Sequence, residues 1–135
     1  MVRGITFSAF DLFHAGHVIM LREAKEQCDF LTACIHIDPS KENKDKNKPV
    51  QSLLERQLQV KACRYVDDIL LYNTEDDLLN ILRTVPWDVR IIGEEYYNKN
   101  FTGKQEFEGL HSKRIYYNER KHTFSSTELR NRCKT

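Results

Sequence analysis

The chain has 135 residues and a formal net charge of +1, with 40% apolar and 30% charged residues. This length suits one domain with a single hydrophobic core, and the composition is that of an ordinary globular protein. A charge this close to neutral argues against a general nucleic-acid binder, which usually carries a strong basic excess.

The sequence shows no segment that would direct it into or across a membrane. No apolar run approaches the roughly 20 residues needed to span a bilayer, and the N-terminus lacks the pattern of a secretion signal. The four cysteines fit neither a C-x-x-C metal site nor a dense disulfide framework. Free thiols in a reducing cytosol are therefore expected, and with them a cytoplasmic protein.

The first part of the chain predicts a strand, a helix and a second strand. Apolar and β-branched residues at 3–10 indicate the first strand, and residues 15–28 repeat apolar side chains at helical spacing. The segment 30–37 is almost entirely apolar, as expected for a strand covered on both faces in a parallel sheet.

A polar loop and a second helix follow. The loop at 38–49 is rich in lysine and ends in proline. Ser52 and Glu55 have the spacing of a capping box, which predicts that a helix starts here. The inner face of this helix is assigned to three apolar residues, Leu54, Leu58 and Ala62.

The second half of the chain continues the alternation. The expected strands are 68–72, 88–93 and 113–117, and the expected helices are 74–84, 104–110 and a last one opened by Ser125 and Glu128. Strands that alternate with helices predict an α/β fold: one domain over 1–135, with a five-stranded parallel sheet and helices on both faces. Ligands of such sheets bind beyond the carboxyl ends of the strands, where the loops 8–17, 38–49, 93–103 and 118–127 would meet.

Two histidines stand at the start of the first helix. His14 and His17 are three residues apart, which puts both rings on one face near the amino end of that helix. Free backbone N–H groups and the helix dipole favour anions there, and Gly16 lets a ligand approach the backbone closely. Two imidazole donors beside such a site suit a triphosphate.

The run Phe10-Asp11-x-x-His14-x-Gly16-His17 resembles the signature of the HxGH nucleotidyltransferase superfamily. The whole chain is similar to its cytidylyltransferase branch, and most of all to glycerol-3-phosphate cytidylyltransferases. The resemblance implies a Rossmann-like domain that transfers CMP from CTP to a small phosphorylated alcohol, such as glycerol 3-phosphate, and releases pyrophosphate. It also implies Mg²⁺ bound with CTP, small-molecule partners without nucleic acid, and a homodimer.

A second motif lies near the C-terminus. The stretch 120–127 is similar to a family segment that holds the β- and γ-phosphates, and it keeps Arg120 and the hydroxyl residues while 121–124 depart from the pattern. Ser126-Thr127-x-x-Arg130 is similar to the ending of the adenylyltransferase branch. An adenylyltransferase that uses ATP is therefore one alternative, and a non-catalytic nucleotide-binding module is another.

The resemblance assigns a role to each candidate residue. Catalysis is assigned to His14, His17, Lys46 and Arg120. Nucleotide binding is assigned to Ser8, Ala9, Phe10, Asp11, Gly16, Gly93, Glu94, Ser125, Ser126, Thr127 and Arg130. Asp11 is further expected to hold His14 or a divalent ion. The acceptor is assigned to Lys44 and to Arg56, with a supporting role as the alternative for Arg56, and Lys48 is the alternative lysine. No metal site made by the protein alone is expected, because the histidine pair lacks a third ligand.

Overall fold

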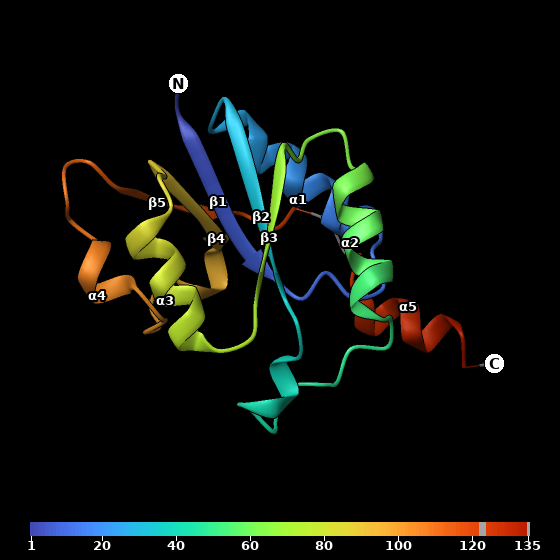
Figure 1. Ribbon diagram of the computed structural model, residues 1–135. Helices are drawn as coiled ribbons and strands as arrows, with labels where there is room; N and C mark the ends of the chain where they lie inside the picture. The colour runs from blue at the N-terminus through green and yellow to red at the C-terminus, as the bar shows by residue number, and fades with distance from the viewer. Residues whose placement is uncertain (122–123, 135) are drawn as a thin grey trace.

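The computed structural model describes residues 1–121 and 124–134. Within these residues, five parallel strands form one sheet in the order β3-β2-β1-β4-β5 (Figure 1). The strands are β1 (Arg3–Ser8), β2 (Phe30–His36), β3 (Asp68–Tyr72), β4 (Val89–Gly93) and β5 (Arg114–Asn118). The predicted α/β class, Rossmann-like with a parallel sheet, is confirmed.

Helices cover both faces of the sheet, as predicted. The bounds are α1 (Ala15–Glu26), α2 (Leu53–Ala62), α3 (Glu75–Thr84), α4 (Lys104–Phe107) and α5 (Ser126–Arg132), with short 3₁₀ helices η1 (Pro39–Lys41) and η2 (Glu94–Tyr96). In Figure 1, α1 and α2 lie to the right of the sheet, and α3 and α4 lie to the left. The last helix, α5, lies beyond the lower edge, where the strands have their carboxyl ends.

The core has one cluster on each face of the sheet. Ala33 and Ile35 of β2 pack in the cluster that includes Leu21 of α1, whereas Cys34 between them packs in the cluster that includes Leu78 of α3. Successive side chains of a strand point to opposite faces, so β2 is buried on both. This explains why its sequence is an unbroken apolar run. All four cysteines of the chain are free thiols.

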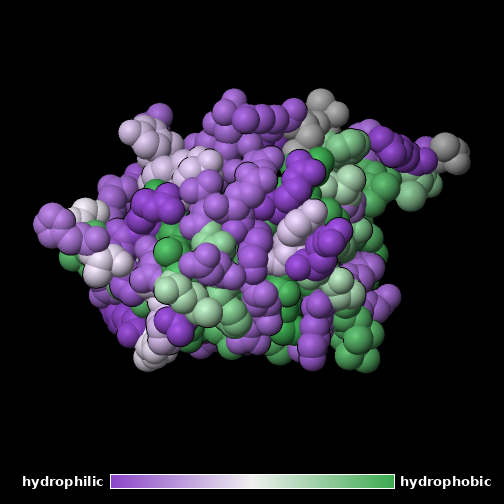
Figure 2. Space-filling view, turned by 90° about the horizontal axis from the view of Figure 1, so that it is seen from above, coloured by the Kyte–Doolittle hydropathy of each residue, from purple (hydrophilic) through white to green (hydrophobic). Residues whose placement is uncertain are grey.

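The prediction for the inner face of α2 was wrong. Leu54 and Leu58 are 65% and 61% exposed, and the buried residues of this helix are Arg56 and Val60. Both sets have helical spacing, and the spacing alone could not choose between them. The buried set contains Arg56, and a charged residue is not expected on the buried face of a helix when that face is predicted from apolar residues. Apolar colour in Figure 2 gathers on the side where α2 lies in Figure 1.

The strand β1 ends at Ser8 rather than at Phe10, because the backbone turns sharply there. Phe10 has a φ of 53° and Leu12 has a φ of 50°. Both values lie in the left-handed region, which a side chain with a Cβ rarely adopts. Phe10 is fully buried in the core cluster below α1, so packing offsets the backbone cost of this turn.

Capping residues fix the helix starts that matter for the site. Ser52 accepts from the Glu55 N–H, and the Glu55 carboxylate accepts from the Ser52 N–H, which confirms the predicted capping box of α2. Ser125 accepts from the Glu128 N–H at 3.0 Å and begins α5 as predicted. The carboxylate of Glu128 is instead bound by Arg132, one turn later.

Candidate active site

The two motif histidines form the cap of α1. The Nδ1 atom of His14 accepts from the Gly16 N–H at 2.9 Å, and the Nδ1 atom of His17 accepts from the His14 N–H at 3.1 Å. The two ring centroids are 4.0 Å apart, and the ring of Phe13 stacks on that of His17 with a centroid distance of 5.3 Å. The sequence predicted that the rings would lie together, and the structure confirms it.

This capping fixes which nitrogen of each neutral ring carries the proton. A ring nitrogen that accepts a hydrogen bond has no proton of its own, so in both histidines the proton is on Nε2. Each ring therefore has an Nε2–H donor on the side away from its backbone contact. Donors held in place before the reaction are the kind of group that stabilises charge developing on a phosphate.

Asp11 joins three segments of the site. Its two carboxylate oxygens accept from the backbone N–H groups of Val50 and Gln51, each at 2.9 Å, and Arg130 donates to Oδ2 at 3.3 Å. Ser126 donates to the Asp11 carbonyl at 3.3 Å. The result is that α5 and the end of the lysine loop are both fixed to the loop before α1. Whether Asp11 also holds His14 or a divalent ion stays a prediction.

Arg56 is buried at the carboxyl ends of β1 and β2. Its side chain is 2% exposed, and its terminal nitrogens donate to the carbonyls of Ala9 at 3.0 Å and of His36 and Ile37 at 2.6 Å each. Burial lowers the pKa of this guanidinium, while Asp11 and Asp38 act in the opposite direction. This is the supporting role that the sequence left open, and contact with an acceptor phosphate stays a prediction.

The structure describes the C-terminal motif, residues 120–127, except for positions 122 and 123. Arg120 is exposed and donates to the carbonyl of Phe124. His122 and Thr123, which the sequence comparison placed in this motif, lie outside the described residues. Ser126 and Arg130 hold α5 on Asp11, so the last helix and the histidine loop lie at the same edge of the sheet. Phosphate contacts by Arg120, Ser125 and Thr127 stay predictions.

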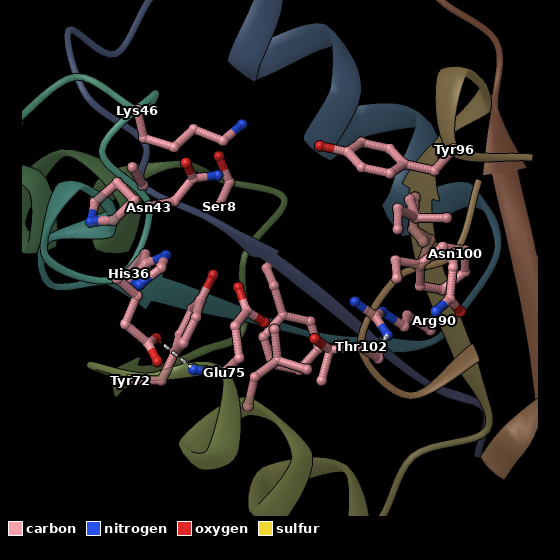
Figure 3. A pocket seen from close by; sticks show the side chains of 18 residues that line it. Ser8, His36, Asn43, Lys46, Tyr72, Glu75, Arg90, Tyr96, Asn100 and Thr102 are labelled. Atoms are coloured by element: carbon pink, nitrogen blue, oxygen red, sulfur yellow. Dashed lines mark hydrogen bonds between the residues drawn. The ribbon is translucent and has the colours of Figure 1, made fainter. Parts of the chain in front are cut away.

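A cavity of about 690 Å³ opens at the carboxyl ends of the strands (Figure 3). Ser8, Ala9 and Lys46 line it, together with His36, Tyr72, Glu75, Arg90 and Tyr96. A second hollow of about 390 Å³ lies between the lysine loop and α5, where Lys48, Thr127 and Arg130 line its wall. Lys44 is exposed and lines neither cavity, and Gly93 and Glu94 lie at the start of η2 beside the first one.

Arg90 is a charged residue of the cavity that the sequence did not predict. Its side chain is only 5% exposed, although it stands between Val89 and Ile91 in an apolar strand. Burial lowers its pKa to about 10, and nearby groups, Tyr72 and Glu75 first among them, oppose that shift. The signal available in the sequence was the charge itself, since an arginine in the middle of a buried strand needs a specific partner.

The described residues form no metal-binding site of protein ligands alone. In the ranges 1–121 and 124–134, no group of three or more His, Cys, Asp and Glu side chains is placed to hold an ion. Nor does any helix in these ranges combine the length and apolar character that crossing a bilayer requires.

Residues 5–132 match the cytidylyltransferase-like family. Ethanolamine-phosphate cytidylyltransferase of Arabidopsis thaliana is 52% identical over 64 residues, which make up 47% of this chain and 15% of that protein. The bifunctional protein HldE of Campylobacter fetus is 33% identical over 101 residues, which make up 74% of this chain and 22% of that protein. The chain thus spans only about a fifth of the length of the curated relatives it matches.

A solved structure agrees with the fold. The lipopolysaccharide core biosynthesis protein of Thermoplasma volcanium superposes with a TM-score of 0.67 at 23% identity, covering 87% of this chain and 97% of that chain. The resemblance to the cytidylyltransferase branch, first seen in the histidine motif, extends over nearly all of the sequence. The chain therefore belongs to the cytidylyltransferase-like family.

Proposed function

We propose that this chain transfers CMP from CTP to the phosphate of a small phosphorylated molecule and releases pyrophosphate. The observation that carries the proposal is the contact between Asp11 and Arg130, which fixes α5 beside the loop of His14 and His17. Both motifs lie at the carboxyl edge of the sheet, where folds of this kind bind their ligands. Membership of the family supports CTP as the donor.

In the proposed reaction, an oxygen of the acceptor phosphate attacks the α-phosphorus of CTP in line. The bond between the α-phosphorus and the bridging oxygen breaks, and pyrophosphate leaves without a covalent enzyme intermediate. His14 and His17 direct their Nε2–H groups at the α-phosphate and the bridging oxygen. Lys46 and Arg120 offset the charge that grows on pyrophosphate, and Lys44 binds the incoming phosphate. Catalysis then consists of positioning and charge stabilisation.

Mg²⁺ enters the proposal with the triphosphate. The carboxylate of Asp11 is already bound by Arg130 and two backbone N–H groups, and the described residues form no cage of their own. In the proposal the ion keeps several waters and binds mainly through the phosphates of CTP, as Mg²⁺ prefers. Treatment with EDTA is expected to abolish turnover, and added Mg²⁺ is expected to restore it.

The acceptor is proposed as a phosphorylated alcohol. The sequence resemblance favours glycerol 3-phosphate, whereas relatives from Arabidopsis thaliana and Mus musculus are named for ethanolamine phosphate. Both compounds present the same attacking phosphate, so the mechanism above serves either of them. Glycerol 3-phosphate stays a prediction.

Pyrophosphate release tests the proposal. The purified chain is mixed with each of the four common nucleoside triphosphates, Mg²⁺ and either glycerol 3-phosphate or ethanolamine phosphate. We expect release with CTP. Release with ATP alone would identify an adenylyltransferase, and CTP binding without release from any mixture would identify a non-catalytic nucleotide-binding module.

A homodimer and a cytoplasmic location are part of the proposal. The exposed leucines of α2, Leu54 and Leu58, support a partner surface, because neighbouring exposed apolar side chains often mark an interface. Light scattering on the purified chain is expected to give twice the mass of 16.0 kDa. Fractionation of cells that produce the full protein tests the location.

A further inference from the structure

Arg90 carries a charge in the interior of the protein. Burial lowers its pKa only to about 10, so the guanidinium stays protonated at neutral pH. A buried charge is costly unless an opposite charge or hydrogen bonds compensate it.

The protein compensates Arg90 only in part. Among the described residues, no carboxylate oxygen lies within ion-pair distance of its guanidinium. One terminal nitrogen, Nη1, donates to the Thr102 carbonyl at 2.6 Å, while Nε is buried and has no partner. The rings of Phe7 and Phe101 lie 5.0 and 5.1 Å from Cζ. These contacts hold the plane of the guanidinium in place without neutralising it.

The guanidinium lies in the wall of the 690 Å³ cavity. In Figure 3, Arg90 and Thr102 lie on one side of the cavity, and Ser8 and Lys46 lie on the other. Arg90 pairs in register with Ile5, so its backbone lies deeper in the sheet than Ser8, where β1 ends. The group is therefore a fixed cation on the inner wall of the cavity, away from the edge that carries the histidine motif.

We propose that Arg90 binds an oxyanion of the acceptor in this cavity. The proposal rests on the proposed function, because it assumes that the cavity holds the acceptor. The oxyanion is either the reacting phosphate or a second acidic group, a carboxylate, at the far end of the molecule. A guanidinium binds both kinds of oxyanion through charge-assisted, often forked hydrogen bonds. Thr102 accepts one N–H of Nη1, so the second N–H of Nη1 and the two of Nη2 are the terminal donors that remain.

Binding of four acceptors to the chain saturated with CMP tests this proposal. The probes are glycerol 3-phosphate, ethanolamine phosphate, 3-phosphoglycerate and O-phosphoserine, and calorimetry gives each Kd. We expect Arg90→Met to weaken binding by about 10- to 100-fold, the range for losing a hydrogen bond to a charged group. Arg90→Lys should retain part of the affinity. The control is Arg83→Met, since Arg83 is exposed and pairs with Glu106 outside the cavity.

The pattern of losses identifies the oxyanion. An equal loss for every acceptor that binds means that Arg90 holds the phosphate, and a loss confined to 3-phosphoglycerate and O-phosphoserine means that it holds a carboxylate. Unchanged affinities in a folded Arg90→Met protein would overturn the proposal, and so would failure of all four probes to bind the wild type. If Arg90→Met does not fold, unchanged affinities in Arg90→Lys overturn it. Pyrophosphate release from CTP is measured separately, so the proposed function can stand when this proposal fails.

Discussion

Arg130 donates a hydrogen bond to the carboxylate of Asp11, which lies 119 positions earlier in the chain. Asp11 is 8% exposed, and the same carboxylate receives the N–H groups of Val50 and Gln51. One side chain thus holds together the loop before α1, the end of the lysine loop and α5. The position of the last helix depends on this contact, and we expect nucleotide binding to depend on it too.

Arg130→Met is expected to raise the Kd for CTP by at least about 10-fold, because a charge-assisted hydrogen bond that docks α5 is lost. Asp11→Asn leaves Arg130 in place and should cause a similar loss if the pair acts by docking the helix. Arg132→Met is the control, since Arg132 pairs with Glu128 on the exposed side of the same helix. Normal CTP affinity in both Arg130→Met and Asp11→Asn would show that the pair has no such role. Calorimetry gives the Kd of each variant for CTP.

The two ring nitrogens of His17 have different roles: Nδ1 accepts the His14 N–H, and Nε2 is the proposed catalytic donor. Two substitutions separate these roles. His17→Asn keeps an acceptor for the His14 N–H but removes the Nε2–H donor. Turnover should fall by about 10²- to 10³-fold, as when one transition-state donor is removed, with little loss of stability. His17→Ala also removes the acceptor of the His14 N–H and should cost a further ~1 kcal/mol of unfolding free energy, as for the loss of one hydrogen bond. A His17→Asn enzyme with wild-type turnover would refute the catalytic assignment.

Arg56→Met is expected to destabilise the fold strongly. It leaves the carbonyls of Ala9, His36 and Ile37 without their donor. Each unsatisfied buried group costs about 1–3 kcal/mol, so the loss should reach about 3 kcal/mol or more. Urea unfolding measures it, and Lys61→Met serves as control because Lys61 is exposed on the same helix. A loss of unfolding free energy below about 1 kcal/mol, less than one unsatisfied carbonyl should cost, would mean that water takes the place of the guanidinium.

The cap of α3 makes the stability of the fold sensitive to acid. The N–H groups of Asn73 and Thr74 donate to the Asp77 carboxylate at 3.0 and 3.1 Å and hold its pKa below the usual value. The folded state then binds this proton less readily than the unfolded chain. Stability that is present above the usual aspartate pKa is lost as the pH falls through the lowered pKa of the folded state.

Asp77→Asn should therefore show a smaller drop in Tm between pH 6 and pH 3 than the wild type, measured by circular dichroism. Asp76→Asn is the matched control, because Asp76 is exposed in the same turn and receives no hydrogen bond from the N–H groups of residues 73 and 74. Equal acid sensitivity of the wild type and Asp77→Asn would contradict this account of the cap.

The sequence was sufficient for the order of elements because each element has a strong local signal. The apolar run of β2, the spacing of Ser52 and Glu55, and the His14–His17 pair each lie within a few residues. Each signal depends on local geometry alone: the pleat of the strand for β2, the first helical turn for Ser52 and Glu55, and one helical face for the two histidines.

The sequence was insufficient where long-range contacts decide. Leu54 and Leu58 have the spacing of an inner face, yet Arg56 is buried because three carbonyls from other segments receive its guanidinium. Phe10 adopts a left-handed backbone because the core holds its ring. The partners of Asp11 and Arg90 come from segments that no local pattern connects. These residues organise the site, and only the folded chain shows them.

Hydrogen exchange with and without CTP tests most directly whether the two motifs serve one ligand. The central claim is that the histidine loop and α5 hold the same polyphosphate. We predict that CTP slows amide exchange at 14–17 and at 125–130 together, at the same CTP concentration and before any acceptor is added. Protection of only one of these segments, or of neither at a concentration of CTP that saturates binding, would contradict the claim.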